Sequence, residues 1–350
     1  MGRVVRGMAV MDATRGPGRL EIGTAAILRA RTDLMMTKIA SLLLAAALLL
    51  PVGGCNPKPE SGASAPPLRI SMQGSNDDPA LVKRREAYQQ FLGKATGRPV
   101  KLYESSDYNG VIQALASGQV DVATLAGASY ANADAQVGEK IAPILTVRRA
   151  DGGTGYYSAL MVRDDSPFRS LADLKGKRLG YVDFNSTSGY LYPRAQMRDA
   201  GIDPDTYFSN TAFAGGHTQA IMALANGQFD ATFVQVSGGD PVHGFSTGAV
   251  YTMAKRGLVD LKAFRTLWVI GPIPDTSIVV RTDRSQADID LVRGAMASLP
   301  YDEPEIWSEI GQPEGSNFTA IDRRHYAEVI RLRNADIALR RKGGAEAGAR

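Results

Sequence analysis

The chain has 350 residues, with 40 Lys/Arg, 36 Asp/Glu and one cysteine. The segment before Cys55 accounts for the whole formal charge of +4, because basic and acidic residues are equally numerous from Cys55 onward. A basic surface for nucleic acid is therefore excluded, and the single cysteine excludes an internal disulfide framework. The part of the chain from Cys55 onward is long enough for two lobes of ordinary domain size.

Residues 1–54 are predicted to be an N-terminal extension followed by an export signal. Residues 35–38 (Met-Met-Thr-Lys) precede an apolar run over 39–52, and Val-Gly-Gly leads into Cys55. A positive start, a short apolar core and small residues before a cleavage point are typical of a secretory signal. The run is too short to cross a bilayer comfortably. The segment also resembles the bacterial lipobox, so we predict lipidation of Cys55, with a plain signal peptide as the alternative. The candidate starts are Met1, Met35 and Met36.

Strands and helices are predicted to alternate along the rest of the chain. Residues 55–67 are expected to be a lipid anchor and flexible tether, and residues 340–350 a disordered tail. The alternation predicts an α/β fold with mainly parallel sheets flanked by helices. Ligands on such sheets bind beyond the carboxyl ends of the strands. The predicted strands cover 68–72, 100–103, 120–125 and 178–182, and the predicted helices cover 79–96, 108–117, 190–200, 286–298 and 323–338.

One segment occurs twice. Ile-Gln-Ala-Leu-Ala-Ser-Gly-Gln-Val-Asp at 112–121 is echoed by Ile-Met-Ala-Leu-Ala-Asn-Gly-Gln-Phe-Asp at 221–230 without any insertion or deletion. Each copy has the pattern of a helix end, a glycine C-cap and a turn into a strand. Two copies are too few for a solenoid and predict two similar lobes, with chance similarity as the alternative. The same offset pairs Tyr108 with His217, which places each at a helix start facing the crevice between the lobes. For His217 a solvated helix start is the alternative.

A polar loop over 183–190 joins a predicted strand to a predicted helix. It contains three consecutive hydroxyl residues, Ser186, Thr187 and Ser188. Side-chain donors beside unpaired backbone N–H groups, at the positive end of a helix dipole, can hold a small oxyanion. An ordinary N-cap is the alternative. Pro193 lies inside the predicted helix and should cost it a hydrogen bond unless it is near the first turn.

These motifs together resemble the phosphate/phosphonate/phosphite substrate-binding proteins of bacterial ABC importers, the PhnD-like family, from Leu68 to about Ile330. The resemblance implies a two-lobed type II periplasmic-binding fold with hinge strands near 155–158 and 270–276. Lobe I would comprise 68–155 and 276–339, with lobe II inserted as 156–275. The matching pieces are Asp107-Tyr108 with the pattern that follows it, Gly-Ala-Ser-Tyr at 127–130, Gly-Tyr-Tyr-Ser at 155–158, the segment 170–177, the loop 185–190, Gly-Ile-Asp-Pro at 201–204 and Gly216-His217.

The resemblance also implies a ligand site without metal or cofactor. The oxyanion would lie at the polar loop over 183–190, the hydroxyl loop, with further donors from both lobes and from the hinge. The ligand-binding residues implied are Tyr108, Ser186, Thr187, Ser188, His217 and either Tyr156 or Tyr157. Ser129 and Asp275 are further candidates for contact with the ligand.

The sequence departs from the family at two positions. Members that hold an aminoalkylphosphonate place carboxylates after a second-lobe strand and just after an Ile-Pro at the returning hinge. Here residues 232–239 contain no acid, and Asp275 arrives one residue early after Ile273-Pro274. An amine-bearing ligand is therefore disfavoured. Asp275 could instead accept the proton of a singly protonated oxyanion and reject sulfate, with a plain turn residue as the alternative.

The prediction is therefore a monomeric lipoprotein in the periplasm or at the cell surface. It would carry a phosphorus oxyanion to an ABC permease and its ATPase. A sensor that reports ligand to a membrane receptor or histidine kinase is the main alternative. A hydrolase is less favoured, because no Gly-x-Ser-x-Gly elbow surrounds any serine. The three histidines also form no metal-spaced cluster, and no Gly-rich nucleotide loop is present.

Overall fold

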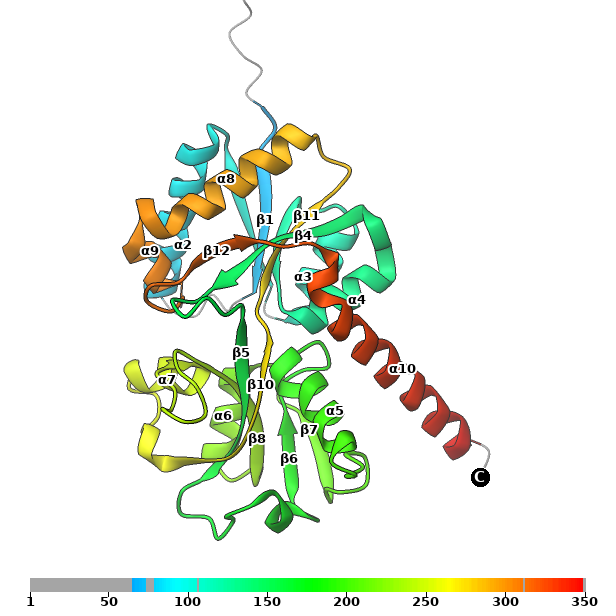
Figure 1. Cartoon of the computed structure of the whole chain (residues 1–350). Coiled ribbons are helices and arrows are strands. Elements are labelled where there is room, and N and C mark those ends of the chain that lie inside the picture. Colours follow the sequence, from blue (N-terminus) through cyan, green and yellow to red (C-terminus); the bar gives the residue numbers. More distant parts are fainter. Residues whose placement is uncertain (1–64, 74–78, 106, 311, 349–350) are drawn as a thin grey trace, which may run out of the picture. The chain divides into compact units, whose positions relative to one another are not determined.

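The computed structural model describes residues 65–73, 79–105, 107–310 and 312–348 (Figure 1). The predicted export signal, Cys55 and most of the tether lie outside these residues. Among the helices that are described, none is long and apolar enough to cross a membrane.

The first sheet has six strands in the order β12-β4-β11-β3-β1-β2. β1 pairs in parallel with β2 and β3, whereas β11 runs antiparallel to β3 and β4, and β12 antiparallel to β4. The strands are β1 (Leu68–Gln73), β2 (Val100–Ser105), β3 (Val122–Leu125), β4 (Ile141–Arg148), β11 (Ser277–Arg281) and β12 (Asn317–Ala320).

Helices cover both faces of this sheet (Figure 1). One face packs on α2, α8 and α9 through an apolar cluster that includes Leu92, Met296 and Trp307. The other face packs on α3 and α4 through a second cluster that includes Ile112 and Tyr130. The helices are α2 (Pro79–Thr96), α3 (Tyr108–Ala116), α4 (Gly127–Val137), α8 (Gln286–Asp302), α9 (Pro304–Glu309) and α10 (Ala327–Gly348).

The second sheet has the order β10-β5-β8-β6-β7, with β9 paired to β8. β6 runs parallel to β7 and β8, whereas β5 runs antiparallel to β8 and β10. Its elements are β5 (Gly155–Arg163), β6 (Arg178–Tyr181), α5 (Tyr192–Asp199), β7 (Asn210–Phe213), α6 (His217–Ala225), β8 (Ala231–Ser237), β9 (Thr247–Gly248), α7 (Ala249–Lys255) and β10 (Phe264–Pro274).

Both sheets are mixed rather than mainly parallel, which corrects one detail of the predicted fold. The parallel pairs belong to strand–helix–strand units, as expected. The chain passes between the sheets twice, through residues 149–154 and 275–276. The strand that follows each passage, β5 and β11, runs antiparallel to both of its neighbours in the sheet. The α/β architecture with two helix-flanked sheets is confirmed.

The predicted repeat is present in the structure. α3 leads through Gly118 (φ 78°) into β3, and α6 leads through Gly227 (φ 71°) into β8. Asp121 accepts hydrogen bonds from the backbone N–H and Nε of Arg69, both at 3.0 Å. Asp230 accepts the same pair from Arg178, at 2.9 and 3.1 Å. The two arginines are separated by the same offset as the two aspartates, so chance similarity is excluded as the explanation of the echo.

The predicted helix over 190–200 begins differently from the expectation. A π-helical turn, Thr187–Leu191, precedes α5. Pro193 then falls in the first turn of α5, where its missing N–H costs no intrahelical bond.

The tail predicted to be disordered is largely helical, because α10 continues to Gly348. Two contacts of Arg340 help to hold this helix: its Nη1 donates to the Tyr190 hydroxyl at 2.9 Å, and its guanidinium lies 4.9 Å from the centre of the Phe184 ring.

Candidate functional site

The hydroxyl loop follows β6 and is closed by its own side chains. The Asp183 carboxylate accepts from the Asn185 N–H at 2.7 Å, and the Ser186 hydroxyl accepts from the Gly189 N–H at 2.9 Å. A side chain at Gly189 would meet Val182 at 2.4 Å, so only glycine fits there. Ser186, Thr187 and Ser188 are each 1% exposed. The loop is therefore an N-cap, as in the simpler interpretation, and it is also buried where an ordinary N-cap would face water.

The first turn of α4, which follows the first sheet, contacts this loop. The Ala128 N–H donates to the Thr187 hydroxyl at 2.9 Å, and the Ser129 hydroxyl donates to the Asn185 carbonyl at 3.1 Å. The Asn132 amide donates to Asn185 Oδ1 at 2.8 Å. Elements that belong to the two sheets are thus joined at the loop, and Ser129 takes part by bonding the loop itself.

β5 contacts the loop from the side of the second sheet. The Ser158 hydroxyl donates to the Ser188 carbonyl at 2.6 Å. Burial raises the pKa of Tyr156 above its usual range, while hydrogen bonds to Ser188 and Thr187 oppose that rise. The Tyr156 hydroxyl therefore lies at the loop as a neutral donor.

Tyr157 points to the opposite face of β5, as strand alternation requires. Its ring packs 5.2 Å from that of Phe245 and 5.9 Å from the guanidinium carbon of Arg149. Of the two predicted hinge tyrosines, the structure brings only Tyr156 to the hydroxyl loop.

The two helix starts predicted to be equivalent lie close to the loop. Tyr108, the first residue of α3, is buried against Val182 and Ala220. Val182 directly precedes the loop, and Ala220 belongs to α6. His217 is the first residue of α6, and its Nδ1 is buried without a hydrogen-bond partner in the part of the chain that is described. Burial lowers the pKa of His217 to about 4. The imidazole is therefore neutral at physiological pH and can donate one hydrogen bond.

Asp275 lies in the passage from β10 to β11. Its carboxylate accepts from the Thr276 N–H at 2.7 Å and the Thr276 hydroxyl at 3.3 Å. Burial raises the pKa of Asp275 to about 6, against the opposing effects of Thr276 and of the charge on Arg149. The negative charge of Asp275 in turn contributes to the raised pKa of Tyr156, so the two groups lie near one another.

Arg149 is a functional candidate that sequence reasoning missed. It lies in the other passage between the sheets, is 9% exposed, and places its Nη1 3.4 Å from the hydroxyl of Ser237, at the end of β8. Its Nε is buried without a hydrogen-bond partner within the described chain, and lies 3.9 Å from the exposed carboxylate of Asp151. No local pattern marks an arginine as buried, since arginines are mostly exposed.

A second missed group lies behind the loop. Asp336 of α10 is 3% exposed and accepts from Arg194 Nε at 3.2 Å, Arg198 Nη1 at 3.3 Å and the Tyr190 hydroxyl at 3.2 Å. Arg333, one turn earlier, donates to the Phe184 carbonyl at 2.7 Å. Helix α10 therefore contacts the hydroxyl loop near both of its ends, at Phe184 and at Tyr190.

Several groups in this region have the chemistry that anion binding uses. They are the hydroxyls of the loop, a neutral imidazole, a buried guanidinium and the start of α6, which no side chain caps. Among the described residues, no group of three or more His, Cys, Asp or Glu side chains could hold a metal ion.

Comparison with known proteins agrees with this geometry. Residues 71–326 match the family model of the periplasmic substrate-binding protein of the phosphonate ABC transporter. The chain belongs to this family. The family consists of binding proteins and not of enzymes, and its periplasmic location implies that the chain is exported.

Individual relatives are similar over much of the chain. The phosphate-import protein PhnD of Mycolicibacterium smegmatis is 31% identical over 242 residues, which cover 66% of this chain and 72% of that protein. The phosphonates-binding periplasmic protein of Escherichia coli is 32% identical over 210 residues, or 59% of this chain and 58% of that one.

Solved structures share the fold. A binding component of an ABC phosphonate transporter from Pseudomonas aeruginosa has a TM-score of 0.65 at 22% identity, over 76% of this chain and 85% of that one. PhnD1 from Prochlorococcus marinus, solved with methylphosphonate, has a TM-score of 0.61 at 18% identity, over 76% of this chain and 96% of that one. They support the type II periplasmic-binding architecture.

Proposed function

We propose that the protein captures a small phosphorus oxyanion without an ammonium group and delivers it to an ABC permease. The observation that carries the proposal is the buried hydroxyl loop, where the Thr187 hydroxyl accepts from the first turn of α4. The relatives named for phosphate import and phosphonate binding support the same ligand class.

The ligand would be held by donors from elements of both sheets. Ser186, Thr187 and Ser188 would contact its oxygens, with Tyr108, Tyr156 and His217 completing the set. Each hydrogen bond to a charged oxygen contributes about 1.5–3 kcal/mol. Several of them, less the cost of ordering the ligand and closing the lobes, support micromolar binding, about −8 kcal/mol. Because donors come from both sides, ligand would favour the closed form.

The lobe limits proposed for this movement follow the passages of the chain. Lobe I would comprise 68–155 and 276–339, and lobe II 156–275, with the hinges where the chain passes from sheet to sheet. Tyr157 and Ser129 would contribute indirectly, through the packing and loop contacts described above.

The charge around β8 supports exclusion of an amine. The segment after β8 contains no acid up to Gly239, and the guanidinium of Arg149 lies against Ser237 in that place. A positive side chain repels a ligand ammonium and attracts a further ligand oxygen. Asp275 would accept the proton of a singly protonated oxyanion, which sulfate lacks.

Calorimetric titration tests the proposal on protein unfolded and refolded to remove carried-over ligand. The panel is phosphate, phosphite, methylphosphonate, 2-aminoethylphosphonate and sulfate. We expect one of the first three to bind tightly, 2-aminoethylphosphonate at least about tenfold more weakly, and sulfate not at all. Thr187→Ala should abolish tight binding. If folded protein bound none of the five compounds, the proposal would be contradicted.

Arg149→Gln tests the charge selection separately. It should reduce the difference in affinity between methylphosphonate and 2-aminoethylphosphonate, because the ligand ammonium would no longer be repelled by a positive charge. Arg148→Gln, at the exposed neighbouring position, is the matched control and should leave that difference unchanged. Equal effects of the two variants would rule out a selective role for Arg149.

We further propose that the protein acts as a monomer, anchored through lipid on Cys55. The basis for the lipid anchor is the single cysteine, which directly follows a segment with the features of an export signal. The full chain should partition into the detergent phase when expressed in a bacterium, and the Cys55→Ala variant should remain in the aqueous phase. Equal partitioning of the two would contradict the anchor.

A further inference from the structure

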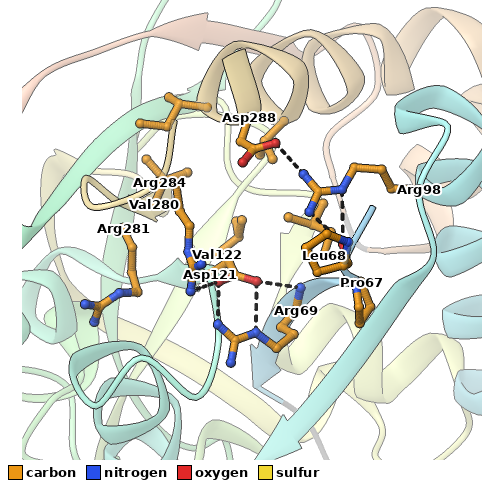
Figure 2. Close-up of a pocket in the computed structure, with 13 residues that line it drawn as sticks. Pro67, Leu68, Arg69, Arg98, Asp121, Val122, Val280, Arg281, Arg284 and Asp288 are labelled. Atoms are coloured by element: carbon orange, nitrogen blue, oxygen red, sulfur yellow. Dashed lines mark hydrogen bonds and ion pairs between the residues drawn. The ribbon is translucent and has the colours of Figure 1, made fainter. Parts of the chain in front are cut away.

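A cavity of about 300 Å³ lies at the end of the first sheet away from the hydroxyl loop (Figure 2). It is bounded by Leu68 at the start of β1, Val122 at the start of β3 and Val280 near the end of β11. Ile289 and Val292 of α8 complete an apolar wall. The volume is at the lower end of the range typical of small-molecule pockets.

Charged side chains form the rest of the lining. Figure 2 shows Arg69 and Arg284 both directed at Asp121, and Arg98 directed at Asp288. The distances are 2.6 Å from Arg69 Nη2 and 2.7 Å from Arg284 Nη2 to Asp121 Oδ1. With Arg281, which also lines the cavity, four guanidinium groups face the three carboxylates of Asp121, Asp283 and Asp288, which leaves one positive charge.

The carboxylates of Asp121 and Asp288 are both paired with arginines, but they do not occupy every N–H donor of those arginines. Burial would raise the pKa of Asp121, but the hydrogen bonds from Arg69 outweigh it and the pKa is lowered, so the group is ionised at neutral pH. Each guanidinium carries five N–H donors. Arg284, whose side chain is 41% exposed, places one Nη at Asp121 and its Nε 4.0 Å from the Asp283 carboxylate. Arg281 also lines the cavity, but its guanidinium is directed at Asp283 and at the carbonyl of Leu115.

The second repeat shows which part of this arrangement is structural. Arg178 and Asp230 reproduce the pair of Arg69 and Asp121. At the first repeat, Arg284 joins the pair from the turn before α8. The pair itself is thus explained by the fold, whereas the additional arginine is not required for it.

We propose that this cavity is a second binding site, specific for a small organic carboxylate. The spare positive charge fits a monoanion, a guanidinium fork fits the geometry of a carboxylate, and the apolar wall fits an organic substituent. The site is independent of the oxyanion site, because it lies at the opposite end of the strands of the first sheet.

The test uses benzoate as the probe and benzyl alcohol as its uncharged counterpart. Titrations are followed by NMR on the full chain with labelled valine methyl groups. Benzoate should shift the methyl signals of Val122, Val280 and Val292 at millimolar concentration, and benzyl alcohol should shift them far less. Equal shifts by the two probes, or no shift by benzoate, would overturn the proposal.

Two substitutions at the rim should act in opposite directions. Arg284→Gln removes the spare charge while Arg69 still pairs with Asp121, and should weaken benzoate binding roughly tenfold or more. Asp288→Asn raises the net charge and should tighten binding severalfold. Arg293→Gln on the same helix, paired with Asp290 outside the cavity, is the matched control. If Arg284→Gln and Arg293→Gln behave alike, the carboxylate site is excluded; methylphosphonate affinity should be unchanged in all three variants.

Discussion

The two repeat units of the protein are alike at one end of their sheets and different at the other. At the amino end of the strands, Asp121 and Asp230 each accept hydrogen bonds from the backbone N–H and the side chain of an arginine. At the carboxyl end, Asp107 caps α3 by accepting from the Gly110 N–H at 2.7 Å, whereas α6 begins after Gly216 without a side-chain cap.

This difference separates stability from binding. A capped helix start has used its N–H groups internally, and an acid there repels an anion. An uncapped start with a neutral histidine leaves donors free for a ligand. The end that both units share maintains the fold, and the end at which they differ is where a ligand site is proposed.

The largest expected effect comes from giving the second unit the cap of the first. Gly216→Asp should stabilise α6 by only about 0.3 kcal/mol, because glycine is itself tolerated as an N-cap. It should weaken oxyanion binding at least a hundredfold, because like charges brought together cost several kcal/mol. The backbone at Gly216 is extended, and a new side chain would first meet the flexible end of Gln219. Calorimetry and thermal unfolding measure the two effects.

Gly216→Asn is the control for that substitution, because it supplies a cap without a charge. It should stabilise α6 similarly and weaken binding much less than the aspartate. Unchanged affinity in Gly216→Asp would show that the oxyanion does not lie at the start of α6.

The next effect tests the end that the units share. Asp121→Ala should lower the free energy of unfolding by about 2–3 kcal/mol and Asp230→Ala by about 1–2 kcal/mol, because Asp121 is the more buried and serves two arginines. Urea denaturation measures both. Equal losses, or a greater loss at Asp230, would mean that the two pairs do not differ as their surroundings suggest.

Much of this comparison could be predicted from the sequence, since its signals are local. The repeat, the N-cap at Ser186 and the start of α3 at Tyr108 each depend on a few neighbouring residues. The π-helical turn could not be predicted in this way, because it depends on how the loop meets Val182 and on the position of Pro193.

The buried charges were missed for a different reason. Arg149 and Asp336 are buried in part by segments distant in the chain, such as β8 and α5. Sequence alone predicts charged side chains at the surface. The antiparallel pairs were missed because they depend on which strands become neighbours in each sheet, and that is a property of the whole topology.

The support that α10 gives to the second unit predicts an intermediate effect. Asp336→Asn removes the charge that balances Arg194 and Arg198, and should lower the free energy of unfolding by about 2 kcal/mol. It should also raise the dissociation constant of the oxyanion, because Tyr190 borders the hydroxyl loop. Asp205→Asn, which affects the exposed second partner of Arg194, should cost less than about 1 kcal/mol. Similar losses in the two variants would contradict a special role for α10.

An effect that depends on pH is expected where the chain passes between the units, at Asp275. Folding raises the pKa of this carboxyl from 3.8 to about 6 by burial, so the folded state holds the proton more tightly than the unfolded state. The free energy of unfolding therefore falls as the pH rises through this interval, and the cost is fully present above pH 6. His217 acts oppositely, because its pKa is lowered to about 4, so the test must compare variant with parent at each pH. Asp275→Asn should have a free energy of unfolding up to about 3 kcal/mol higher than the parent at pH 7.5, and should match it at pH 3.5, below both pKa values of the carboxyl. A constant difference across the pH range would show that Asp275 is not the titrating group, and an unchanged rejection of sulfate by the variant would remove its proposed part in selecting the ligand.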